Sequence, residues 1–135
     1  MNIWKQENNL ERLFCRFHMN KRYQKHVFVC VNERPAESER NDCTRCGGKD
    51  LRIKLVNLVN KNGLRGKVRI NKSGCLDACE KGPAMVIYPN EFWYLNVKDA
   101  NIEEIFTESV LGDNAIESLL ANEDDFQKIK ERRSQ

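Results

Sequence analysis

The sequence predicts an α/β protein in which helices pack against a mixed β-sheet. Two features carry this prediction. Short apolar runs typical of strands alternate along the chain with amphipathic segments of helical period. The first strand, helix and strand also follow one another at a spacing that favours a right-handed crossover between parallel strands. At 135 residues, of which 40% are hydrophobic, the chain is long enough for one domain with a modest core.

The first half of the domain is predicted to contain two strands and one helix. The apolar run over 25–31 predicts a buried strand. An amphipathic helix is predicted over 49–62, and its apolar face consists of Leu51, Leu55, Leu58 and Val59. Gly63 is a natural end for this helix, and the alternation over 67–71 predicts the second strand.

The second half is predicted to add a hairpin and a helix. Residues 84–88 and 92–94 predict two strands that are joined at Pro89-Asn90. A capping box of Asn101 and Glu104 begins a helix that ends near Gly112, and a shorter helix is predicted around 115–120. From residue 122 the chain is highly charged, and we expect this tail to be frayed.

Together these elements predict a thioredoxin-like sandwich with a mixed four-stranded sheet and two main helices. Upstream of it, apolar residues at helical spacing predict an N-terminal helical extension, and these are Leu10, Leu13, Phe14 and Phe17. We therefore divide the chain into an N-terminal helical extension (1–22), a thioredoxin-like domain (23–121) and a charged C-terminal tail (122–135).

Composition and charge exclude several classes of function. The net charge of +3 is too small to indicate nucleic-acid binding. The longest apolar runs, 27–31 and 84–88, are too short for a membrane-spanning helix or a secretory signal. Six cysteines without such a signal indicate a reducing compartment, and we expect a cytoplasmic location. No nucleotide-binding loop, nucleophile elbow or carboxylate pair occurs in the sequence, so we expect no enzymatic activity.

Five of the cysteines lie at a strand end or in two polar loops. Cys30 ends the first strand, Cys43 and Cys46 lie in the loop 32–47, and Cys75 and Cys79 lie in the loop 73–83. In the predicted fold both loops meet at one end of the sheet, where α/β proteins place their sites. We therefore expect the sulfur atoms to gather there.

The residues alone leave three kinds of sulfur site open. Thiolates suit zinc or an iron–sulfur cluster. The compact spacing of two cysteine pairs fits a structural zinc module with the ligands Cys43, Cys46, Cys75 and Cys79. The Cys43-x2-Cys46 motif near the start of a helix also fits a thiol–disulfide oxidoreductase. An iron–sulfur site tolerates the wider interval between Cys30 and Cys43.

Residues 24–111 resemble the thioredoxin-like [2Fe–2S] ferredoxins, a bacterial family. Three stretches carry the resemblance. The strand 25–31 contains the first cysteine, with Arg34-Pro35 following and Cys43 after 12 intervening residues. The stretch 73–83 is similar to the family's GC-x3-C-x2-GP block, and 86–89 with Trp93-Tyr94 is similar to its YP…WY hairpin.

The resemblance implies a one-electron carrier with a [2Fe–2S] cluster, a homodimeric state and redox partner proteins. Carried over residue by residue, it implies the cluster ligands Cys30, Cys43, Cys75 and Cys79. Cys46 departs from the family pattern and offers a replacement for Cys43 as ligand. The thiolates make such a cluster negatively charged, and we expect some of three nearby cations to offset this charge: Arg34, Arg45 and Lys81.

Overall fold

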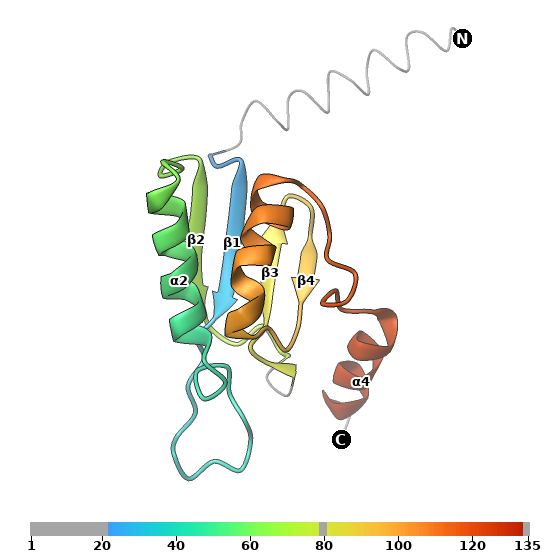
Figure 1. Ribbon diagram of the computed structural model, residues 1–135. Coiled ribbons are helices and arrows are strands. Elements are labelled where there is room, and N and C mark those ends of the chain that lie inside the picture. Colours follow the sequence, from blue (N-terminus) through green and yellow to red (C-terminus); the bar gives the residue numbers. More distant parts are fainter. Residues whose placement is uncertain (1–21, 79–80, 134–135) are drawn as a thin grey trace, which may run out of the picture.

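The computed structural model describes residues 22–78 and 81–133 (Figure 1). The predicted N-terminal extension lies outside these residues, except for Arg22. In chain order the described elements are β1 (Lys25–Cys30), α2 (Gly48–Lys61), β2 (Val68–Ser73), β3 (Met85–Tyr88), β4 (Phe92–Tyr94), the 3₁₀ turn η2 (Asp99–Asn101), α3 (Ile102–Glu104), the π-helical segment η3 (Ile105–Leu111) and α4 (Glu123–Arg133).

The strands form one sheet in the order β2-β1-β3-β4. β1 runs parallel to β2, with Lys25 opposite Val68 and Cys30 opposite Ser73. β3 is antiparallel to both β1 and β4. This arrangement confirms the predicted mixed four-stranded sheet and the parallel crossover through α2.

Side-chain alternation gives the two faces of the sheet different neighbours. Val27 and Val29 of β1 are completely buried and belong to the main core. Phe28 and Cys30 alternate with them and therefore point to the opposite face. Figure 1 shows α2 and the helix formed by α3 and η3 on the same side of the sheet. The main core therefore lies between the sheet and these two helices.

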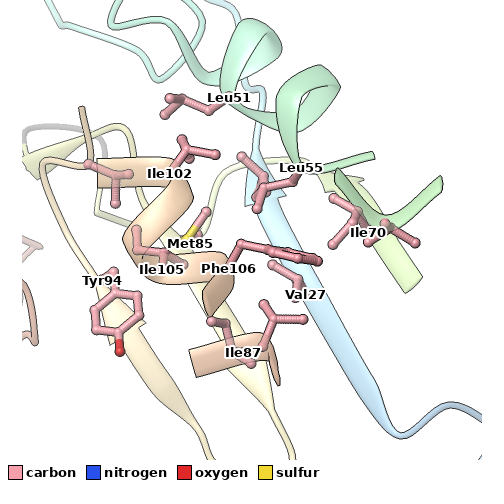
Figure 2. Close-up of a cluster of buried hydrophobic side chains, with 14 of the residues drawn as sticks. Val27, Leu51, Leu55, Ile70, Met85, Ile87, Tyr94, Ile102, Ile105 and Phe106 are labelled. Atoms are coloured by element: carbon pink, nitrogen blue, oxygen red, sulfur yellow. The ribbon is translucent and has the colours of Figure 1, made fainter. Parts of the chain in front are cut away.

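Figure 2 shows how the strands and helices fill this core. Leu51, Leu55 and Val59 of α2 are buried, which confirms the predicted apolar face, and Leu58 packs partly buried beside them. Gly63 follows α2 with a φ of 67°, the left-handed conformation expected at a helix end. From the second half of the chain the buried residues include Met85, Ile87, Tyr94, Ile102, Ile105 and Phe106.

Three predictions for the second half are wrong. Asn101 and Glu104 form no capping box, because the Asn101 side chain accepts the Lys98 N–H (2.9 Å) instead. Residues 115–120 form no helix, and Leu120 instead makes an isolated β-bridge with Tyr94. The tail that was expected to be frayed contains the 11-residue helix α4, whose Phe126 ring packs edge-on against Trp93. The last two differences come from contacts with β4, which local sequence patterns do not reveal. Every helix in the described part of the chain is too short or too polar to cross a membrane.

A chain of hydrogen bonds connects β4 to the segment that follows η3. The Ile116 N–H donates to the Tyr94 hydroxyl (2.9 Å), which lies 2.6 Å from Ser109 Oγ. Ser109 Oγ in turn donates to the Asn114 carbonyl (2.8 Å), so the Tyr94 hydroxyl is the donor to Ser109. Tyr94 and Ser109 are completely buried. These bonds therefore hold 109–116 against β4 in a place that water does not reach.

We predict that Tyr94→Phe destabilises the protein by about 1–3 kcal/mol, because it leaves the buried Ile116 N–H without its acceptor. Urea unfolding measures the change. The matched control is Tyr88→Phe, since Tyr88 is 38% exposed. Equal stability of the two variants would contradict a structural role for the Tyr94 hydroxyl.

Candidate functional site

The parallel pairing of β1 and β2 brings the two cysteine-containing loops to one edge of the sheet. The first loop (31–47) follows β1, and the second loop (74–84) follows β2. The Val31 N–H donates to the Ser73 carbonyl (3.0 Å) at the point where the two loops begin. In Figure 1 both loops lie beyond the same end of the sheet. The predicted meeting of these loops is therefore observed.

A small apolar cluster lies where the loops meet. We call it the cysteine patch, and it consists of Cys30, Cys43, Ala78, Ala84 and Leu95. Both cysteines are completely buried. The patch is separate from the main core, because Cys30 lies on the opposite face of the sheet from Val27 and Val29.

Hydrogen bonds at the sulfur of Cys30 favour its thiolate form. The Cys43 thiol donates to it and, together with the N–H groups of Asn32 and Leu76, lowers the pKa of Cys30 to about 6, although burial opposes this shift. Leu76 belongs to the second loop. Its N–H therefore places that loop directly against the cysteine of β1.

The other two predicted ligands lie in the second loop. Cys75 is exposed, and its sulfur accepts the Asp77 N–H at 3.2 Å. Cys79 lies outside the described residues. Its neighbour Ala78 is 3% exposed and belongs to the cysteine patch. Within 22–78 and 81–133 the structure assembles no group of three His, Cys, Asp or Glu side chains that could hold a metal ion.

The structure places Cys46 differently from Cys43. Cys46 is half-buried, and the Asn41 side-chain amide donates to its sulfur at 2.9 Å. Both residues of this contact belong to the first loop, and Cys46 is not part of the cysteine patch. The two cysteines of the Cys43-x2-Cys46 motif thus have different surroundings.

The side chains of Asp42 and Arg45 hold the first loop in shape, and we call this pair the loop clamp. The carboxylate of Asp42 is completely buried. It accepts the N–H of Arg34 (2.9 Å) and the N–H of Arg45 (2.7 Å), which hold the pKa of Asp42 below its usual range. Arg45 Nε lies 3.3 Å from the same carboxylate.

The guanidinium of Arg45 also crosses to the far side of the loop. It donates to the carbonyls of Pro35 (2.6 Å), Ser38 (3.1 Å) and Arg40 (3.1 Å). The sequence indicated Arg45 only as a cation near the site. Its bonds to three loop carbonyls give it a structural role, which spacing along the chain does not reveal; that it offsets cluster charge stays a prediction.

A glycine allows the two buried cysteines to approach each other. The Gly48 N–H donates to the Cys43 carbonyl (2.7 Å). A Cβ atom at this position would lie 2.3 Å from the Cys30 carbonyl oxygen and 2.9 Å from that of Cys43. Contacts this short are not tolerated, so only glycine fits between the end of β1 and the start of α2.

The helix α4 also reaches this site. Its residue Ile129 packs against the cysteine patch, as do Leu76 and Ala121. Sequence reasoning missed this contribution, although Phe126 and Ile129 are three residues apart, a spacing that puts them on one face of a helix. The acidic first turn and basic end of α4 also match the helix dipole.

The arrangement offers buried sulfur ligands with backbone donors around them. Thiolates of this kind suit a soft or borderline metal centre, and N–H groups at the sulfur stabilise negative charge. Cys43 contacts Cys30, whereas the contact of Cys46 is with Asn41. This geometry favours a site that contains Cys30 and Cys43 over one built on the Cys43–Cys46 pair.

Comparison with known proteins gives a consistent set of relatives, although no protein-family model matches the chain. The chain is 32% identical over 97 residues to a 2Fe-2S ferredoxin of Aquifex aeolicus (strain VF5), which covers 71% of this chain and 87% of that protein. It is 30% identical over 80 residues to a 2Fe-2S ferredoxin of Clostridium pasteurianum, covering 59% of this chain and 78% of that protein.

Solved structures give the same result. The crystal structure of a thioredoxin-like [2Fe-2S] ferredoxin from Aquifex aeolicus aligns with a TM-score of 0.70 at 30% identity, covering 75% of this chain and 99% of that one. A cysteine-to-serine variant of the same protein aligns with a TM-score of 0.69, also at 30% identity, covering 73% and 99%.

We predict that Gly48→Ala destabilises the protein by about 1–3 kcal/mol, because the added methyl group overpacks the space between two backbone carbonyls. Gly74→Ala is the matched control in the second loop, since a Cβ there meets nothing within 4 Å. Urea unfolding of both variants measures the difference. A Gly48→Ala protein as stable as Gly74→Ala would show that the approach of the first loop to the end of β1 is not tight.

Proposed function

This chain belongs to the thioredoxin-like [2Fe–2S] ferredoxins, a family of electron carriers, and we propose that Cys30, Cys43, Cys75 and Cys79 hold its cluster. When bound, a [2Fe–2S] cluster takes up or releases one electron. The chain's own part is to supply thiolates, to place hydrogen-bond donors at them and to limit access of water.

One observation carries this assignment. Cys30 and Cys43 are buried side by side, and the second loop reaches the Cys30 sulfur through the Leu76 N–H. The ligands proposed in the second loop, Cys75 and Cys79, lie on either side of Leu76 and Ala78. The donor set fits the group, because it offers thiolates together with N–H donors that stabilise their charge.

The surroundings of the two cysteines in the first loop support Cys43 as the ligand. Cys43 belongs to the cysteine patch, whereas Cys46 is held by Asn41 outside it. The zinc module and the thiol–disulfide oxidoreductase both require Cys46 to act together with Cys43. No contact in the described residues favours either of these alternatives.

We further propose that the protein acts in the cytoplasm as a homodimer that exchanges electrons with redox partner proteins. Reduced thiols are maintained in that compartment, and the family resemblance supports the dimer. The mass of one chain is 15.8 kDa. Sedimentation of the intact protein tests the dimer, and a species with the mass of a single chain would contradict it.

The ligand assignment predicts the outcome of replacing each cysteine by alanine. Cys30→Ala, Cys43→Ala, Cys75→Ala and Cys79→Ala should each lose most of the visible absorption that dithionite bleaches, because each removes one thiolate–iron bond. Cys46→Ala should retain it. Visible absorption, the electron paramagnetic resonance signal after reduction, and iron and sulfide analysis provide the measurement.

Each alternative gives a different result. Colourless protein with one zinc per chain would support the zinc module. Colourless protein without metal that reduces a disulfide substrate would support the oxidoreductase. If the Cys46→Ala protein contains no iron and the Cys43→Ala protein keeps an unchanged spectrum, then Cys46 and not Cys43 is the ligand from the first loop.

We also propose that the C-terminal tail (122–135) covers the site through α4. Its residue Ile129 packs against the cysteine patch, and Phe126 packs against Trp93 of β4. The basic end of α4 follows Ile129, so it brings positive charge to the same end of the molecule. The tail then acts as part of the site although it lies outside the thioredoxin-like domain (23–121).

For this covering role we predict that the double variant Phe126→Ala, Ile129→Ala loses its iron to a chelator several-fold faster than the unaltered protein, because water reaches the cysteine patch more easily. Lys128→Ala is the matched control, since Lys128 is an exposed residue of the same helix. The decay of the visible absorption gives the rate. If both variants lose iron at the same rate, α4 does not cover the site.

A further inference from the structure

We infer that the loop clamp of Asp42 and Arg45 selects Cys43 rather than Cys46 as the cluster ligand, an inference that rests on the proposed function. Selection is needed because the two sulfurs are only three residues apart. This is the spacing at which paired cysteines usually bind one metal centre together. Without a constraint, either thiol of the first loop is within reach of the same place.

The buried carboxylate of Asp42 fixes the orientation of the turn that contains both cysteines. It accepts N–H groups from Arg34 before the turn and from Arg45 within it, at 2.9 and 2.7 Å. Cys43 is adjacent to Asp42, and this orientation directs its side chain into the cysteine patch. A rotation that moved Cys46 inward would take a buried carboxylate away from its donors, which is costly.

The guanidinium of Arg45 connects this turn to the rest of the first loop. Its three carbonyl acceptors belong to Pro35, Ser38 and Arg40, so the turn cannot rotate without breaking these bonds. The planar guanidinium forms all of them in one geometry, which neither lysine nor glutamine can reproduce.

Two further contacts keep the two cysteines apart. The Thr44 hydroxyl donates to the Val31 carbonyl (2.7 Å), which holds the residue after Cys43 against the end of β1. On the other side the Asn41 amide holds the Cys46 sulfur at 2.9 Å. The clamp thus lies between one thiol that is turned toward Cys30 and another that is turned toward Asn41. Arg45 is accordingly a positioning residue.

The test compares cysteine variants with the clamp intact and with it loosened. In the unaltered background, Cys43→Ala should lose most of the visible absorption because Cys46 cannot move inward. In the Arg45→Gln background, Cys43→Ala should regain a dithionite-bleachable spectrum through Cys46, and adding Cys46→Ala should remove it again. Arg45→Gln alone should lose iron to a chelator about 10-fold faster. The matched control is Arg65→Gln, an exposed arginine that follows α2.

The recovery of a spectrum through a second cysteine is a result that simple destabilisation cannot produce. If Arg45→Gln folds by circular dichroism but Cys43→Ala stays colourless in it, the inference is wrong. It is also wrong if Cys43→Ala keeps a full spectrum with the clamp intact and Cys46→Ala then removes it. If Arg45→Gln does not fold, Arg45→Lys takes its place, because it keeps the charge and loses the guanidinium. The spectra of Cys43→Ala and of Cys43→Ala with Cys46→Ala are then compared in that background, with the same expected and contradicting results. Lack of iron in the unaltered protein would instead reject the proposed function.

Discussion

The parallel pairing of β1 with β2 is the constraint on which the candidate site depends. It ends two strands at the same edge of the sheet, so Cys30 at the end of β1 and Cys75 just after β2 lie at the same edge although they are 45 positions apart in sequence. Gly48 then allows the first loop to return beside the end of β1 before α2 begins. The crossover through α2 that makes the parallel pairing possible thus also brings the sulfur atoms of both loops to one end of the sheet.

Much of the sheet and of the main helices could be predicted, because the spacing of apolar residues along the sequence indicates which side chains are buried. The apolar run of β1 and the apolar face of α2 are examples, since the residues that form them are buried or half-buried. The helix α4 could not be predicted in this way. Its sequence is strongly polar, and it is held by Phe126 and Ile129 through contacts with β4 and the cysteine patch. Such contacts exist only after the sheet has formed.

The same limit applies within the site. Spacing identified Cys30, Cys43, Cys46 and Cys75, which the described residues place at one end of the sheet, but it left Cys43 and Cys46 equivalent. Their difference depends on the buried carboxylate of Asp42 and on the reach of Arg45 across the first loop. No spacing pattern identifies these two residues. Apart from the ion pair between them, the bonds that they make go to backbone groups, and backbone groups are present at every position whatever the sequence.

The two apolar clusters lie on opposite faces of the sheet, and this separation has a consequence for maturation. The main core and the cysteine patch share no residue, so a loss of order at the edge that carries the cysteines leaves the contacts of the main core in place. Iron and sulfide can therefore be inserted into a polypeptide that is already folded. The bound cluster then stabilises one end of a sheet whose main core is held by other contacts, and its loss leaves those contacts in place.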